Sequence, residues 1–282
     1  MNYTIDNYEE IYLKEILDTK EERIQALKDK DILKYKTKTI ISGPMLECEI
    51  YPIWRTSKKS IREKRRKPTC MAQKRLNDRN AVKRVIRLIN ANFDNRHLWG
   101  TFTYNMDNLP VSEEQAKRDM QNYIRRLKRY AEKHGLKELK YVYVTEYSED
   151  EEKGKKRVHH HIVMNFPDRD IAEKLWKNGG RTQTRRLQPD DYGLEGLARY
   201  ITKDPKGSKR YTCSRNLDKP KVFEAYSQFT KRRAEKMAMN PDEAKVFFQK
   251  KFSKYVFNDI DIKYSEFVSG CYIYARLRKI LN

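Results

Sequence analysis

Residues 157–164 read Arg157-Val158-His159-His160-His161-Ile162-Val163-Met164, a run with the composition of a β-strand that holds three of the chain's five histidines. Because successive side chains of a strand point to opposite faces, His159 and His161 share one face of the predicted strand. His160 lies on the other face with the apolar side chains of the run, and we expect that face to pack against a core. Two imidazoles on one face can hold a divalent metal ion. The run therefore predicts a sheet that presents a pair of metal ligands.

Glu146 is the candidate for a third metal ligand, because the preceding segment, residues 139–147, also has the composition of a strand. The charged stretch between the two strands predicts a hairpin. A turn centred on residues 153 and 154 would set Glu146 opposite His161, and a turn one residue earlier would set it opposite His159. Either turn keeps Glu146 on the histidine face, where it completes a site of two histidines and one carboxylate. The alternative is an ordinary exposed charge on a strand.

The surrounding elements predict an α+β fold. A helix is expected over residues 112–134, with Ser112 and Gln115 as a capping box and Gly135 as the stop. Extended segments flank this helix at residues 99–104 and 139–147, so we expect a central antiparallel sheet with helices on one face. The apolar stripe predicted to face the sheet consists of Ala116, Met120, Tyr123, Ile124, Leu127 and Ala131.

The N-terminal region is expected to be helical and to contain a hairpin. Spaced apolar residues within 7–32 favour one or two exposed helices, and two strand-like segments flank Ser42-Gly43-Pro44. Residues 55–67 hold eight basic residues and one acid, which suits either a solvated linker or a phosphate-contacting arm. A basic helix is expected over residues 71–93, with an apolar stripe formed by Val82, Val85, Ile86 and Ile89.

The C-terminal region is predicted to add two helices, over residues 221–237 and 241–251, and two strands, over 254–264 and 267–277. We therefore expect three parts. Residues 1–70 form a helical and hairpin region with a basic arm, residues 71–217 form the core domain, and residues 218–282 pack on that core.

Charge points to the class of partner. Lysine and arginine number 62 against 40 acidic residues, giving a formal net charge of +22 in 282 residues. A polyanion is the natural ligand for such a chain. No apolar run approaches the roughly 18 residues that a spanning helix needs, and Met1-Asn2-Tyr3-Thr4 does not begin a signal peptide, so we expect a soluble cytoplasmic protein with no membrane partner. The four cysteines are widely spaced and are expected to be reduced thiols.

Residues 191–203 predict a short helix that ends before Pro205. Leu194, Leu197, Ala198 and Ile201 would form its buried face. Gly193, Gly196, Tyr200 and Lys203 cluster on a different face, where the two glycines would leave room for a bulky group to approach. Taken alone, Tyr200 and Lys203 would suit an ordinary helix surface.

Three motifs in order resemble those of the HUH endonucleases, in particular the rolling-circle replication initiators (Rep proteins) of plasmids, phages and integrated mobile elements. They are Phe102-Thr103-Tyr104, His159-His160-His161 and Tyr200-Ile201-Thr202-Lys203, and the similarity spans about residues 75–217. The resemblance implies a ferredoxin-like or RRM-like fold whose central strands carry the two histidines. It also implies that the helical N-terminal and C-terminal segments are additions to this core.

The resemblance implies a metal-dependent enzyme that nicks one DNA strand and can rejoin it. Tyr200 would be the nucleophile that retains the 5′ phosphate, with Lys203 assisting. His159 and His161 would be ligands of Mg²⁺ or Mn²⁺, and strand register adds Glu146 to them. The partners would be single-stranded DNA at a replication origin, the origin duplex, and the helicase and polymerase of a bacterial host, in whose cytoplasm the protein would act. No tyrosine stands four residues before Tyr200, where Gly196 is found, so a single-tyrosine mechanism is expected.

DNA contacts are expected from Lys209, Arg210 and Arg215, just beyond the tyrosine helix. Three other functions remain open at this point. A conjugative relaxase or a single-tyrosine transposase would use the same chemistry. A non-catalytic, RRM-like nucleic-acid-binding protein would need neither metal nor nucleophile. A non-haem iron oxygenase would also use two histidines and a carboxylate, but it would not explain the charge or the Tyr200–Lys203 pair.

Overall fold

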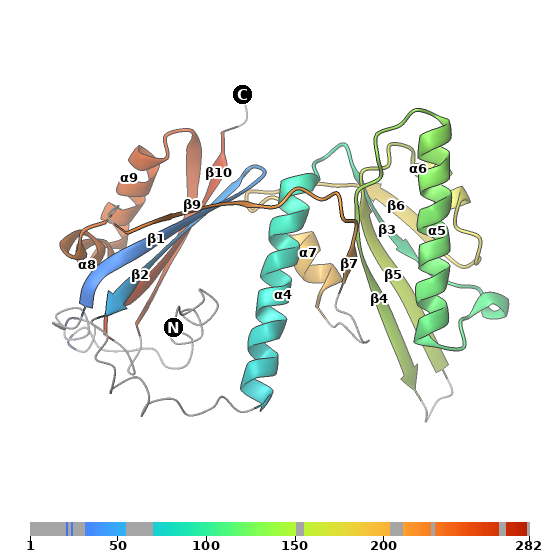
Figure 1. Cartoon of the computed structure of the whole chain (residues 1–282), viewed down its shortest axis with the longest axis horizontal. Helices are drawn as coiled ribbons and strands as arrows, with labels where there is room; N and C mark the ends of the chain where they lie inside the picture. The colour runs from blue at the N-terminus through green and yellow to red at the C-terminus, as the bar shows by residue number, and fades with distance from the viewer. Residues whose placement is uncertain are drawn as a thin grey trace. The chain divides into compact units, whose positions relative to one another are not determined.

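The computed structural model of the chain describes residues 21, 24, 32–54, 70–150, 155–203, 211–226, 229–264 and 269–280. The chain divides into two compact units, which are labelled in Figure 1 by their strands and helices. One unit comprises residues 1–80 and 220–282, and the other comprises residues 81–219. The basic run at 55–67 and nearly all of the region 7–32 lie outside the described residues.

The unit of residues 81–219 is built on a five-stranded antiparallel sheet with the strand order β6-β3-β5-β4-β7. The histidine strand β5 stands at its centre, as the resemblance implied. The elements in chain order are α4 (Cys70–Asn92), which begins before residue 81, β3 (Leu98–Phe102), η1 (Met106–Asn108), α5 (Glu113–Lys133), β4 (Tyr141–Asp150), β5 (Lys155–Met164), α6 (Arg169–Lys174), β6 (Thr182–Arg186), α7 (Glu195–Ile201) and β7 (Thr212–Cys213).

Helix α5 forms as predicted from its caps and its apolar spacing. The hydroxyl of Ser112 accepts from the backbone N–H of Gln115 at 3.2 Å, and Gly135 follows the helix with a φ of 63°. The buried positions are Ala116, Met120, Tyr123, Ile124, Leu127 and Ala131, the six residues of the expected stripe. They pack on the sheet face that carries Phe102, Ile162 and Met164.

The prediction that helices cover one face of this sheet is wrong, because both faces are covered. On the second face, Val142, Val144 and Val163 pack against buried residues of α4 and α7. The physical reason lies in β4, where valines alternate with the aromatic residues Tyr141 and Tyr143, so that both faces of the strand are apolar and need a covering layer. Figure 1 shows α5 on one side of the sheet and α7 with α4 on the other.

The unit of residues 1–80 and 220–282 holds a second antiparallel sheet of five strands, in the order β8-β1-β2-β10-β9. The expected hairpin is confirmed, since Ser42 pairs with Met45 across a turn at Gly43. Two helices pack on the core of this sheet through Ala234, Met237 and Phe248. The elements are β1 (Ile32–Ser42), β2 (Met45–Trp54), β8 (Lys221–Ala225), α8 (Lys231–Met239), α9 (Pro241–Lys251), β9 (Tyr255–Tyr264) and β10 (Cys271–Lys279).

Two expectations about this second unit need correction. Residues 221–225 form an edge strand on β1 rather than the start of a helix, because the helix begins only after Thr230, whose hydroxyl caps it. The N-terminal hairpin and the C-terminal strands are also not separate additions, because β2 pairs with β10 in one sheet. That residues 218–282 pack on the core domain stays a prediction.

The cysteine expectation holds where the structure describes the thiol. Cys48, Cys213 and Cys271 are free, and burial raises the pKa of the Cys48 and Cys271 thiols to about 12. Buried thiols of this kind behave as small apolar side chains. Among the described helices, none combines the length and the apolar character required to cross a membrane.

Candidate active site

The predicted metal ligands lie together on one face of the β4–β5 hairpin. Glu146 pairs directly with His159, so the structure selects the earlier of the two possible turns. Glu146 Oε1 lies 3.6 Å from His161 Nε2, and Glu146 Oε2 lies 3.9 Å from His159 Nδ1. One ligand atom from each of the three residues lies within 4.8 Å of the other two. Two nitrogens and a carboxylate oxygen at this spacing fit a divalent ion of the Mn²⁺ or Mg²⁺ type.

The triad is open on one side. His161 is nearly buried, with 5% of its side chain exposed, whereas the side chains of His159 and Glu146 are 40% and 34% exposed. A metal ion held by three protein ligands in such a place keeps coordination positions for water or substrate. The arrangement therefore suits a catalytic ion better than a purely structural one.

Thr101 holds the ring of His161 in place. Thr101 stands opposite His161 on β3, and its Oγ1 lies 3.0 Å from His161 Nδ1. When Nδ1–H donates to the hydroxyl, the lone pair of Nε2 is left on the side of Glu146. Metal-binding histidines are commonly oriented in this way by a hydrogen bond to the second nitrogen. The neutral imidazole is thus oriented for a ligand role.

His160 is fully buried on the opposite face of β5 and is bonded at both nitrogens. Its Nδ1 lies 2.9 Å from Thr145 Oγ1, and its Nε2 lies 2.8 Å from the hydroxyl of Tyr104. The Tyr104 hydroxyl also interacts with the Asp119 carboxylate of α5. A neutral imidazole satisfies both partners by donating through one nitrogen and accepting through the other. These bonds restrict rotation of β5 about its own axis between the two candidate metal ligands.

Burial keeps His160 neutral. Desolvation, with a smaller contribution from the neighbouring charges of His161 and His159, lowers the pKa of His160 to about 3. Burial also raises the pKa of Tyr104, and the nearby carboxylate of Asp119 acts in the same direction. The network beneath the metal face is therefore held by hydrogen bonds between neutral groups, apart from Asp119 at its end.

Tyr200 lies beside the histidine face, on helix α7. Its ring centroid is 5.5 Å from that of His161 and 6.3 Å from that of Trp99, in edge-on geometry in both cases. The side chain is 55% exposed. Helix α7 docks through the buried Ala198 and Ile201, which turns Tyr200 toward the open side of the sheet. The structure thus brings the predicted nucleophile to the predicted metal ligands.

The helix that carries Tyr200 is shorter than expected. It begins at Glu195, and the backbone N–H of Leu194 donates to the buried Asn90 Oδ1 at 2.7 Å. Gly193 precedes the helix with a φ of 68°, in the left-handed region that favours glycine, so it is a turn residue and not part of the helical face with Tyr200. No atom lies within 4 Å of the position where a side chain on Gly196 would begin. The surface one turn before Tyr200 is therefore open.

The candidate basic residues are distributed unevenly. Lys203 is exposed and follows Tyr200 by three residues. Lys209 and Arg210 lie outside the described residues. Arg215 is exposed but lies beside the start of β4, about 17 Å along that strand from Glu146 at about 3.3 Å per residue. Arg215 is not gathered with the triad.

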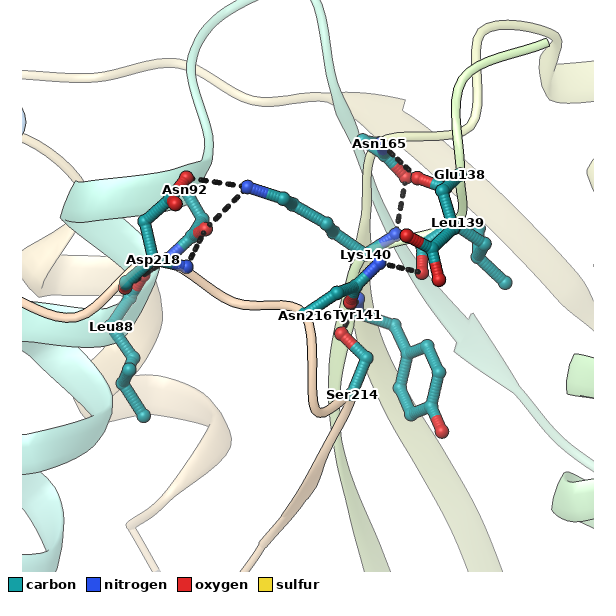
Figure 2. A network of polar contacts seen from close by, with 10 residues as sticks. All are labelled: Leu88, Asn92, Glu138, Leu139, Lys140, Tyr141, Asn165, Ser214, Asn216 and Asp218. Carbon is teal, nitrogen blue, oxygen red and sulfur yellow. Dashed lines mark hydrogen bonds and ion pairs between the residues drawn. The ribbon is translucent and has the colours of Figure 1, made fainter.

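Figure 2 shows how the segment around Arg215 is held. Lys140 Nζ donates to Asn92 Oδ1 at 3.0 Å and forms an ion pair with Asp218. The Ser214 backbone N–H donates to the Tyr141 carbonyl at 3.0 Å, while the Tyr141 N–H donates to the Ser214 hydroxyl. The chain that follows the tyrosine helix is thereby fastened to β4 and to the end of α4.

Two residues of the site were not anticipated. Thr101 and Trp99 alternate along β3 on the histidine face, next to the expected motif Phe102-Thr103-Tyr104. Alternation could have placed both residues on one face, but their neighbours on β5 follow only from the pairing register. The contact between Trp99 and Tyr200 depends in addition on how α7 docks.

Comparison with known proteins supports the interpretation of this region. Residues 97–205 match the family model of the replication-associated protein ORF2. The matched segment contains the triad and Tyr200. No curated protein and no solved structure matches the chain. The resemblance to Rep-type replication initiators is confirmed over the matched residues, which supports a role in the initiation of replication.

Proposed function

We propose that this Rep-type chain starts rolling-circle replication by cutting one DNA strand at an origin, with Tyr200 as the nucleophile. The observation that carries the proposal is the approach of the exposed Tyr200 ring to within 5.5 Å of His161, in a triad that could hold a metal. A phosphodiester lying over His159, Glu146 and His161 would therefore meet a hydroxyl nucleophile from the side of α7.

The reaction is a transesterification. The hydroxyl oxygen of Tyr200 attacks the phosphorus, and the bond from phosphorus to the 3′ oxygen breaks. The tyrosine loses its proton and the departing 3′ oxygen gains one, which leaves a 5′-phosphotyrosine and a free 3′-OH. One phosphodiester replaces another of similar energy, so attack by a 3′-OH on the phosphotyrosine rejoins the strand without ATP.

The residues divide the work of this step. His159, His161 and Glu146 would hold Mg²⁺ or Mn²⁺, and the ion supplies a positive charge to a non-bridging phosphate oxygen. Lys203, close to Tyr200 in the chain, favours the phenolate or neutralises the phosphate. Preorganised positive charge of this kind is the main contribution that a protein makes to phosphoryl transfer.

The product explains the partners. A free 3′-OH is the primer that a host polymerase extends, while a host helicase unwinds the origin ahead of it. Gly196 stands four residues before Tyr200, so the helix offers one nucleophile for each chain. A conjugative relaxase or a single-tyrosine transposase would use the same residues and is the alternative.

The experiment is incubation of the protein with a pool of single-stranded oligonucleotides and Mn²⁺, followed by mapping of tyrosine-linked DNA. Tyr200→Phe should bind DNA with unchanged affinity but form neither nicks nor the covalent adduct, because it lacks the attacking oxygen. Tyr192→Phe is the matched control and should retain both. Nicking by Tyr200→Phe at the wild-type rate would refute the nucleophile, and DNA binding without any adduct by the wild type would favour a non-catalytic binding protein.

A further inference from the structure

The face of the sheet that carries the triad extends beyond it to the edge strand β6. In the pairing register, Gln183 stands next to Thr101, which stands next to His161. One row along, Arg185 stands next to Trp99, the residue whose ring contacts that of Tyr200. Since paired residues of neighbouring strands lie on the same face, Gln183 and Arg185 belong to the catalytic face.

Arg185 is held in place without being neutralised. With the Gln183 amide oriented to satisfy its neighbours, its oxygen accepts from Arg185 Nη2 at 2.7 Å and from Nε at 3.2 Å. Arg185 is exposed, and the described part of the chain gives it no carboxylate partner. The remaining N–H groups of a guanidinium positioned in this way suit a phosphate, which it can bind with two parallel hydrogen bonds.

Trp99 bridges Arg185 and the nucleophile. Its ring is only partly buried, and it meets the Tyr200 ring at an interplanar angle of 77° with centroids 6.3 Å apart. An aromatic side chain on an open sheet face offers a stacking surface for a nucleotide base. Adjacent Arg185 and Trp99 thus combine the two contacts by which proteins bind single-stranded nucleic acid.

We infer that Arg185 and Trp99 form a binding subsite for single-stranded DNA beside the scissile phosphate, with Arg185 on a neighbouring phosphate and Trp99 against a base. The inference rests on the proposed function and names the residues that hold its substrate. β6 lies two strands from β5, or about 10 Å away, close enough for one strand of DNA to span both. A chain with a net charge of +22 has the complementary charge for such a ligand.

The edge position of β6 supports this ligand. β6 pairs with β3 on one side and is the last strand of the sheet, so DNA can leave the catalytic face over it. The next arginine, Arg186, points to the other face, where it donates to the carbonyls of Arg96 and Pro167. Two consecutive arginines thus differ in role: Arg186 fastens the backbone, and Arg185 faces the site.

The test measures binding of a fluorescein-labelled single-stranded poly-thymidine oligonucleotide by anisotropy, in metal-free buffer where no cleavage occurs. Arg185→Gln should weaken binding roughly tenfold, as expected for one charged hydrogen-bonded contact. The slope of log affinity against log salt should fall by about 0.7, the value for one phosphate of a single strand. Arg129→Gln on the exposed surface of α5 removes the same charge from the other side of the sheet and should change neither quantity.

Tryptophan fluorescence provides a second readout, because a base stacked on Trp99 quenches its emission. The wild-type signal should fall on addition of the oligonucleotide, and Trp99→Phe, which keeps an aromatic ring in the packing, should lose most of that change. Equal binding by Arg185→Gln and Arg129→Gln, or unchanged quenching in Trp99→Phe, would overturn the subsite. Neither measurement requires cleavage, so failure of the subsite is distinct from failure of Tyr200 to form an adduct.

Discussion

His160 offers a sharp test of how the metal face is supported. We consider His160→Leu, which keeps a buried side chain of similar size but removes both hydrogen bonds. The Thr145 hydroxyl then loses its partner at a site that is 8% exposed, and the Tyr104 hydroxyl loses one of its two interactions. A buried polar group without a partner costs about 1–3 kcal/mol, and burial of leucine offsets part of this. We expect the free energy of unfolding at neutral pH to fall by about 2–4 kcal/mol.

The pH dependence identifies His160 as the source. Burial lowers the pKa of His160 from 6.5 to about 3 in the folded state. Between these values the unfolded chain binds the proton and the folded chain does not, so the contribution of His160 is complete above pH 6.5 and is lost as the pH falls toward 3. The loss approaches about 1.4 kcal/mol per pH unit, or about 4–5 kcal/mol across the window. His160→Leu lacks this contribution, so the difference in stability between wild type and variant should shrink as the pH falls.

Urea unfolding at a series of pH values measures both effects. Tryptophan emission is a suitable signal, because the ring of Trp176 lies 5.6 Å from that of His160. His159→Leu is the matched control: it removes a histidine from the same strand, but one whose side chain is 40% exposed, and it should retain the wild-type pH dependence. The reasoning is refuted if His160→Leu and the wild type lose stability in parallel between pH 6.5 and 3.

Two further substitutions test the support of the site. Thr101→Val, which keeps the shape of the side chain, should weaken Mn²⁺ binding in calorimetry by about 10–100-fold because the ring of His161 loses its orienting hydrogen bond; equal Mn²⁺ affinity would show that the bond does not orient the ligand. Lys140→Met should lower the free energy of unfolding by less than about 1 kcal/mol, because the Asp218 side chain is 74% exposed. A larger loss in urea titration would mean that the network of Figure 2 acts cooperatively.

Local patterns predicted much of the unit formed by residues 81–219. The two-residue period of a strand separated His159 and His161 from His160, and the caps and spacing of residues 112–134 gave the helix and its buried face. These features depend on neighbours in the chain, so a single sequence contains them. The second buried face of the sheet was missed because both faces of β4 are apolar, and strand alternation alone does not reveal which partner covers each.

Long-range pairing decided the rest. Alternation placed Glu146 on the histidine face, but the turn left two registers open, and the fold pairs Glu146 with His159. The sequence by itself determined the ligand types, the strand that bears them and the basic charge that favours a polyanion. Only the tertiary structure brought Tyr200 to His161, set Trp99 and Arg185 beside them, and joined the N-terminal hairpin to the C-terminal strands, because these contacts link segments far apart in the chain and no local propensity encodes them.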